Sequence, residues 1–232
     1  MDQILEDFRP FKDVWGLIQP AVGGSSGNGL RYTSEYLFSL LEHGSITLEE
    51  EEAITRAIDS CEYGEQIGVL FRTPENKDQN APDDYVAIIA ISAFLKDNRA
   101  SMYPRRFIIH WDMYDGVFQN NGGIDNPSAW FWRMPHLLVH AKFAAGFYID
   151  LWSMLPWVWA VLQSAFSKKQ DNKILGWYLL RAAKGKSKIA DKLFSFWSWM
   201  LKRHYEGGIG HVLREYFGFE HPSAKYLLGV FQ

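Results

Sequence analysis

The chain has 232 residues, a net charge of −3 and one cysteine, Cys61. This length suits one large domain or two small ones, and a single cysteine excludes an intrachain disulfide. The first residues are acidic and lack the basic start and apolar run of a secretory signal, so they do not predict Sec export.

Aromatic side chains make up 16% of the residues, with 10 Trp, 11 Tyr and 16 Phe. Each ring buries on the order of 150–250 Å² when it is covered, so most of them are expected to form the core. The alternative is that some of the rings line a groove that stacks on a sugar or contacts a partner.

Charge is unevenly distributed along the chain. Residues 1–131 hold 10 basic against 21 acidic side chains, whereas residues 132–232 hold 14 against six. An acidic half and a basic half attract each other, either within the molecule or between copies. Two solvated faces without a partner explain the same counts.

The first predicted helix covers Asp2–Leu17 and is bent or broken at Pro10. Residues Gly23–Gly29 (GGSSGNG) predict a flexible loop, which lacks the Lys-Ser/Thr ending of a phosphate-binding loop. A short helix is expected over Thr33–Glu42, with its leucines on one face.

Thr47 and Glu50 have the spacing of a capping box, in which the Thr hydroxyl and the Glu carboxylate each satisfy a backbone amide. The acidic run Glu49–Glu52 then lies in the first turn, where the helix dipole favours negative charge. The helix is expected over Leu48–Cys61, with Cys61 as a small buried residue.

A polar loop is expected over Thr73–Pro82, followed by an unbroken apolar run at Val86–Leu95. Such a run fits a helix surrounded by other helices, although a buried strand is the alternative. The Pro-Asp-Asp start and the length from Asp83 to Lys96 favour the helix.

Residues Phe107–Met113 fit either a strand or a short helix, and Asn120–Gly123 (NNGG) predicts a turn. No convincing hairpin signal is present. Pro135 and Pro156 divide the following aromatic stretch into helices. Further helices are expected over Asp171–Ala183, Lys186–Arg203, Ile209–Phe217 and Pro222–Phe231. The fold class is therefore all-α, one domain over residues 1–232 with about nine to eleven helices.

Residues Phe143–Phe166 are long enough to cross a bilayer. Asp150, Pro156 and Gln163 interrupt this segment, and no second span is present. We expect a pair of buried core helices rather than a membrane span.

The strongest candidates for chemistry are Asp83 and Asp84, followed by Tyr85. Neighbouring carboxylates push their pKa values apart and can serve as general acid and base. Helix capping explains one aspartate, since Asp is a preferred first-turn residue, but makes the second redundant.

A second cluster contains His110, Trp111 and Asp112, with Arg105 and Arg106 nearby. A ring that stacks on a sugar, together with carboxylate and guanidinium groups that hold its hydroxyls, suits a polyhydroxylated ligand. We therefore expect Asp83, Asp84, His110 and Asp112 to be catalytic, and Tyr85, Trp111, Arg105 and Arg106 to bind the ligand. No cofactor and no metal are expected.

Two further groups of candidate functional residues show weaker patterns. His136 and His140 share one helical face, but the metalloprotease pattern requires Glu where Leu137 stands. The stretch Lys168–Arg203 carries ten basic and two acidic residues among aromatic rings, which would attract nucleic acid or anionic membrane. An ordinary amphipathic helix, with rings inward and lysines outward, explains the same pattern and is the favoured interpretation.

The segments Leu30–Leu41, Thr47–Cys61 and Asp83–Ser92 resemble a loose group of bacteriophage and metagenome proteins. Their helical hairpins are similar to those of α/α-toroid proteins, where polysaccharide hydrolases and lyases place acidic and aromatic residues in a central cleft. The resemblance implies a partial toroid-like bundle and a protein of a host cytoplasm or a virion. No catalytic residue transfers from it.

The leading hypothesis is a phage-type helical protein that binds or cleaves a cell-surface glycan. The alternative is a non-catalytic structural or virion-assembly protein that contacts itself or other virion proteins through aromatic and charged surfaces.

Overall fold

The structure is a computed structural model of the whole chain. It describes residues 2–23, 29–43, 46–62, 68, 70–71, 73–74, 82–95, 102–113, 118–120, 130–132, 135–167, 170–204 and 221–226. The predicted helix at residues 209–217 and most of the predicted loops at residues 23–29 and 73–82 lie outside these ranges.

The described residues form ten α-helices, one short 3-10 helix and one pair of strands, which confirms the all-α prediction. The elements are α1 (Asp2–Phe8), η1 (Arg9–Phe11), α2 (Gly29–His43), α3 (Leu48–Asp59), α4 (Pro82–Ser92), α6 (Tyr103–Met113), β1 (Phe118–Asn120), β2 (Trp130–Trp132), α7 (Pro135–Ala144), α8 (Leu155–Phe166), α9 (Gln170–Ala183), α10 (Lys188–His204) and α12 (Pro222–Tyr226).

The strand pair was not predicted from the sequence. β1 and β2 run antiparallel with Gln119 opposite Phe131. Each strand has three residues, too few to show an alternating pattern, and nine residues separate them rather than a tight turn. The segment Phe107–Met113, for which strand and helix were both open, is helical within α6.

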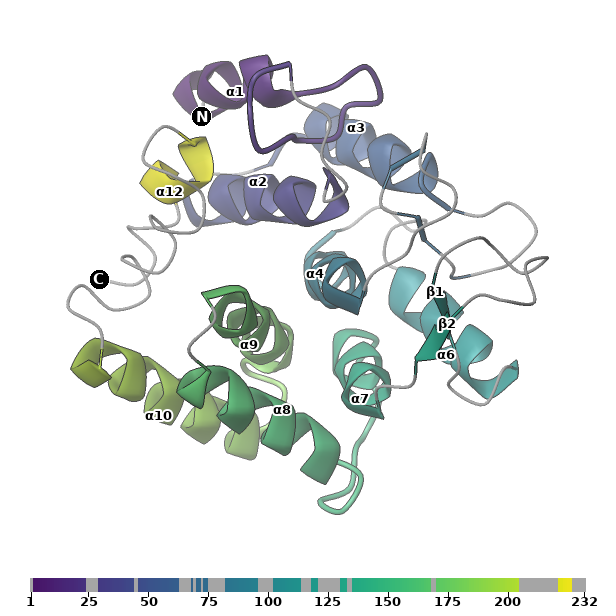
Figure 1. Cartoon of the computed structure of the whole chain (residues 1–232), viewed down its shortest axis with the longest axis vertical. Coiled ribbons are helices and arrows are strands. Elements are labelled where there is room, and N and C mark those ends of the chain that lie inside the picture. Colours follow the sequence, from purple (N-terminus) through teal and green to yellow (C-terminus); the bar gives the residue numbers. More distant parts are fainter. Residues whose placement is uncertain are drawn as a thin grey trace.

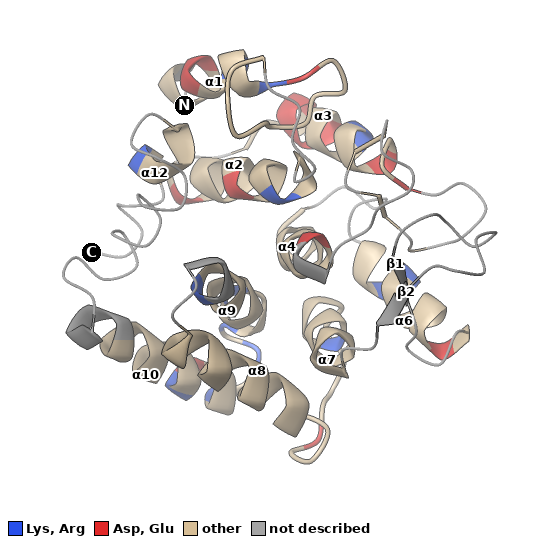
Figure 2. Cartoon of the chain, viewed as in Figure 1, with Lys and Arg blue, Asp and Glu red and all other residues tan. Residues whose placement is uncertain are grey.

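Helices α4, α7 and α9 form the centre of the molecule and are seen nearly end-on in Figure 1. Helix α2 packs against α4 on one side, while α8 packs against α7 and α9 on the other. Helices α8 and α10 contact each other and lie along the lower edge of Figure 1. The acidic α1 and α3 lie at the upper edge of the same view (Figure 2).

Helix α4 is covered on every side, as its unbroken apolar run predicted. From Tyr85 to Ile91 no residue is more than 3% exposed. Its amphipathic character is accordingly weak, and its side chains contact α2, α6, α7 and α9.

Close packing of α8, α9 and α10 depends on Gly176 in α9. A Cβ added there would lie 1.7 Å from the Ser164 hydroxyl of α8, so only glycine fits. Ser164 in turn accepts a hydrogen bond from the Trp197 indole of α10 at 3.1 Å. This junction fixes the relative position of the two helices that form the lower edge.

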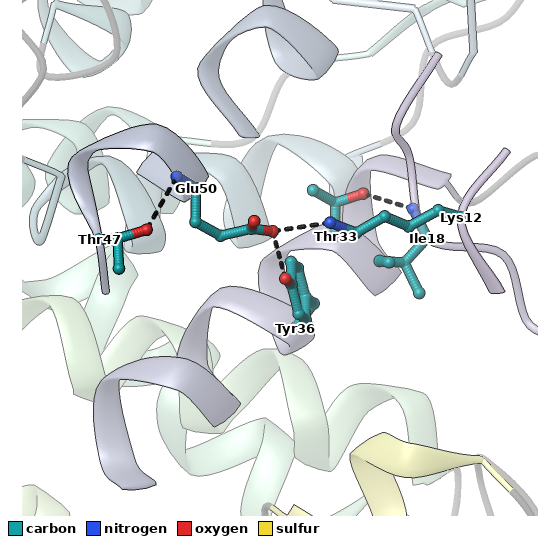
Figure 3. Close-up of polar contacts among 6 residues, drawn as sticks. All are labelled: Lys12, Ile18, Thr33, Tyr36, Thr47 and Glu50. Carbon is teal, nitrogen blue, oxygen red and sulfur yellow. Dashed lines mark hydrogen bonds and ion pairs between the residues drawn. The ribbon is translucent and has the colours of Figure 1, made fainter. Parts of the chain in front are cut away.

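Glu50 joins the N-terminal segment to α2 and α3 (Figure 3). The Thr47 hydroxyl accepts a hydrogen bond from the Glu50 amide at 3.2 Å, as the capping pattern predicted. The Glu50 carboxylate, however, accepts hydrogen bonds from the Lys12 ammonium at 2.7 Å and from the Tyr36 hydroxyl. The predicted return bond to the cap is therefore replaced by a tertiary contact.

We expect Glu50→Ala to lower the free energy of unfolding by about 2 kcal/mol, because it removes two hydrogen bonds to a half-buried carboxylate. The matched control is Glu49→Ala, which removes an exposed carboxylate from the same first turn. The two variants lose the same helix-dipole interaction. Urea denaturation of both measures the difference; equal losses would show that the contacts to Lys12 and Tyr36 add nothing.

Among the residues that the structure describes, no helix combines the length and the apolar content needed to cross a bilayer. The segment Phe143–Phe166 is divided by a loop, residues 145–154, between α7 and α8.

Candidate functional site

Asp84 and Tyr85 lie inside the molecule at the start of α4. Each is only 1% exposed. The Tyr85 hydroxyl accepts a hydrogen bond from the Leu70 amide at 2.9 Å, and burial raises its pKa. The side chain of Asp83 lies outside the described part of the chain. The predicted acidic turn is thus partly core rather than an open surface.

The predicted residues of α6 point in two directions. His110 and Trp111 are 5% and 8% exposed and face the core, where burial lowers the pKa of His110 to about 4. Arg105 and Asp112 are exposed on the opposite face of the helix. Arg105 and Asp112 share one face of the helix because they are seven residues apart. His110 and Trp111 lie on another face.

Arg106 has a structural partner at the end of α3. Its guanidinium forms an ion pair with Glu62 at 2.6 Å, and it lies 5.4 Å from the centre of the Tyr103 ring. The Tyr103 hydroxyl donates to Asp59, also at the end of α3. These contacts dock α6 on α3.

The predicted site residues whose side chains the structure describes therefore do not share one surface. A chain of rings connects part of the set: Tyr85 lies 5.4 Å from Phe107, which lies 6.1 Å from Trp111. This interior cluster joins α4 to α6, while Arg105 and Asp112 remain outside it. Arg105 and Asp112 lie on a different side of α6 from His110 and Trp111, because adjacent helical residues turn by about 100°.

His136 and His140 of α7 differ in their exposure to solvent. His140 is fully buried, with Nε2 at 2.8 Å from the carbonyl of Val86, and burial lowers its pKa to about 3. His136 is half-buried rather than solvated. Cys61 is buried as predicted, and burial raises its pKa to about 12, which makes it a poor nucleophile.

A different surface concentrates exposed rings. We call it the aromatic face, and it is formed by the α7–α8 loop and by the outer sides of α8 and α10. Its ten members are Phe147, Tyr148, Leu151, Trp152, Leu155, Trp159, Phe166, Ile189, Phe196 and Trp199. Every one of them is at least 39% exposed, and Tyr148 reaches 92%.

The α7–α8 loop presents its rings outward because its backbone is folded around Asp150. Gly146 ends α7 with a φ of +77°, a conformation that favours glycine. The Asp150 carboxylate then accepts hydrogen bonds from the amide and the hydroxyl of Ser153, at 2.9 and 2.5 Å. With the turn closed on itself, Trp152 is left 78% exposed. In Figure 1 the loop projects at the same edge as α8 and α10.

Helix α8 carries apolar residues on both sides. Trp157 and Val161 are buried against the bundle, whereas Leu155, Trp159 and Phe166 form an exposed stripe with the spacing of one helical face. The expectation that Phe143–Phe166 forms a wholly buried helix pair is therefore wrong for the outer side of α8.

Helix α10 combines rings with lysines on its outer side. Lys188, Lys192 and Trp199 are spaced along one exposed stripe, and Phe196 lies beside it with its ring 6.1 Å from that of Trp199. The buried side is formed by Ala190, Trp197 and Met200. The sequence predicted that the rings face inward and the lysines outward. Trp197 does face inward, whereas the rings of Phe196 and Trp199 lie on the outer side.

The surroundings of the aromatic face are basic. Residues 142–204 hold 11 Lys and Arg against three Asp, a net charge of +8. Lys184, Lys186 and Lys188 are all exposed at the turn that leads into α10. The aspartate at position 191 accepts a hydrogen bond from the Gly185 amide at 2.7 Å.

No family model, no curated protein and no solved structure matches this chain. The resemblance to phage proteins and to α/α-toroids consequently stays a prediction. The glycan-binding and virion-assembly hypotheses stay predictions too.

Proposed function

We propose that the protein binds the surface of a membrane that contains anionic lipid, through the aromatic face. The observation that carries the proposal is the concentration of exposed Trp, Tyr, Phe and Leu side chains on the α7–α8 loop, α8 and α10, together with exposed lysines in the same part of the chain. Large exposed apolar patches are rare on proteins that lack a partner or a membrane.

The side-chain chemistry favours the lipid interface. Tryptophan and tyrosine concentrate where hydrocarbon meets water, because their rings are apolar and carry one polar atom. Trp152, Trp159 and Trp199 are 51–78% exposed, and Tyr148 stands out almost completely. Protruding rings on a loop tip enter a soft interface without requiring a complementary pocket on a partner.

The charges complement an anionic leaflet. Each lysine or arginine close to such a surface contributes about 1 kcal/mol of attraction, which salt screens. Four exposed lysines, Lys184, Lys186, Lys188 and Lys192, lie between α9 and the middle of α10. Attraction by the lysines and burial of the rings act together, as in interfacial amphipathic helices.

Sedimentation with vesicles tests the proposal. We expect binding to vesicles that contain phosphatidylglycerol and weak binding to neutral phosphatidylcholine vesicles. Added salt should reduce the binding but not abolish it, because ring burial does not depend on ionic strength.

Three results would overturn the proposal. These are failure to bind anionic vesicles, binding to DNA that accounts for all of the attraction, and self-association that covers the aromatic face. Sedimentation velocity and a polysaccharide pull-down, run on the same protein, detect the partners named by the other hypotheses.

A further inference from the structure

A cavity of about 460 Å³ opens beside the aromatic face, where the α7–α8 loop meets the turn between α9 and α10. Its volume lies within the range of small-molecule sites. It is lined by Phe143, Gly146, Phe147, Tyr148, Ile149, Lys186 and Ser187.

Lys186 supplies the cavity with a fixed positive charge. Its ammonium donates hydrogen bonds to the carbonyls of Phe143 and Ala144, at 2.8 and 3.2 Å, which hold it at the end of α7. Within the described part of the chain it forms no ion pair with a carboxylate. Loss of water around the ammonium lowers its pKa. A charge that is partly desolvated and paired only with neutral carbonyls attracts an anion strongly.

The remainder of the lining divides into a polar and an apolar part. Ser187, the residue after Lys186, is the polar neighbour in the lining, whereas Phe143 and Ile149 add apolar wall. Phe147 and Tyr148 belong both to this cavity and to the aromatic face, so the cavity and the rings meet the same surface. A matching ligand is amphiphilic, with an anionic group at Lys186 and an apolar part against the rings.

We infer that this cavity binds the phosphate group of a single phospholipid, with Lys186 as the cationic contact and Ser187 as a hydrogen-bond donor. The inference rests on the proposed membrane binding and adds a headgroup site to it. It predicts a preference for phosphate over other anions at equal surface charge.

The test compares vesicles of equal negative charge, one set made with phosphatidylglycerol and the other with an anionic lipid whose charge is a carboxylate. We expect the wild-type protein to bind the phosphate lipid roughly tenfold more tightly, the scale of one charged hydrogen bond. Lys186→Met should lose this preference. The matched control is Lys192→Met, which removes an exposed lysine from outside the cavity and should keep the preference.

Both lysine variants lose one positive charge, so each should bind the carboxylate vesicles about fivefold more weakly. On the phosphate vesicles, Lys192→Met should show the same loss of about fivefold, whereas Lys186→Met should lose the roughly tenfold advantage in addition. Because Lys186 also holds the end of α7, circular dichroism must show that the variant is folded. If it is not folded, Ile149→Trp provides the test instead. This variant fills the cavity without changing the charge, so it should bind the two vesicle types with equal affinity.

The outcomes separate the inference from the proposed function. Equal binding to the two vesicle types by the wild-type protein, or equal preferences in Lys186→Met and Lys192→Met, would overturn the headgroup site and leave membrane binding standing. No binding to either vesicle would overturn both. If inorganic phosphate binds as tightly as a soluble short-chain phosphatidylglycerol, the occupant is free phosphate and the lipid assignment fails.

Discussion

Replacing Trp152 and Trp159 together by serine is expected to weaken binding to anionic vesicles on the order of a hundredfold. Each indole transfers part of its roughly 150–250 Å² from water into the interface, at about 25 cal/mol per Å². A transfer of under half of that area corresponds to about tenfold per ring. The two residues lie on the α7–α8 loop and on α8, 78% and 63% exposed.

The control is Trp15→Ser, which removes an indole that is 46% exposed. Its segment, between η1 and α2, lies at the edge opposite α10 in Figure 1. This variant should bind vesicles like the wild-type protein. Vesicle titration followed by sedimentation measures both variants.

Protein stability serves as the second readout for the indole variants. Exposed rings contribute little to folding. The free energy of unfolding of Trp152→Ser/Trp159→Ser, measured by urea denaturation, should therefore differ from that of the wild-type protein by no more than about 0.5 kcal/mol. Unchanged vesicle binding in this folded variant would contradict a membrane role for the face.

Local sequence signals predicted most of the helices because helix boundaries depend on nearby residues. Pro135 begins α7, Pro156 lies in the first turn of α8, and Thr47 caps α3. Each of these residues acts within a few positions of itself, through its fixed φ or its hydroxyl. Such signals need no knowledge of the tertiary fold.

Which side of a helix is buried depends on distant residues, and here the prediction was weaker. Trp157 and Trp159 of α8 have the same side chain, yet the first is fully buried and the second is 63% exposed. The apolar pattern of α8 contains both, so periodicity alone does not choose between them. The choice is made by α9, whose Gly176 allows one side of α8 to approach closely.

Buried charge is a second feature that the sequence did not indicate. Arg31 and Glu35 of α2 are 2% and 0% exposed, although charged residues are seldom fully buried. The Tyr178 hydroxyl of α9 donates to Glu35 at 2.6 Å across 143 residues of sequence. Pairing with a partner so far along the chain is visible only in the fold, as is the burial of Asp84 at the predicted acidic site.

Acid is expected to destabilise the protein well above the pH at which carboxylates titrate. Burial lowers the pKa of His110 and His221 to about 4 and that of His140 to about 3. At pH 7 and above, these histidines are largely neutral in both the folded and the unfolded chain. Below about 6.5 the unfolded chain takes up protons that the folded chain excludes, so stability falls as the pH falls.

The size of this effect approaches the whole stability of the protein. At pH 5, one histidine shifted in this way costs about 2 kcal/mol, and three cost on the order of 6 kcal/mol against a typical total of 5–15 kcal/mol. The lowered pKa of Asp7, about 2, adds a further loss only below its ordinary value of 3.8. Urea denaturation at several pH values between 7.5 and 5 gives the free energy of unfolding directly.

His140→Gln provides the decisive comparison. The buried Nε2 of His140 lies 2.8 Å from the Val86 carbonyl, where a neutral ring donates a hydrogen bond. A glutamine amide supplies a donor there but does not titrate. We expect the variant to be somewhat less stable at pH 7.5, with a shallower loss of stability between pH 6.5 and 5 by about one proton, or roughly 1.4 kcal/mol per pH unit. An unchanged slope would mean that His140 does not exclude protons from the folded core, and that acid sensitivity comes from other groups.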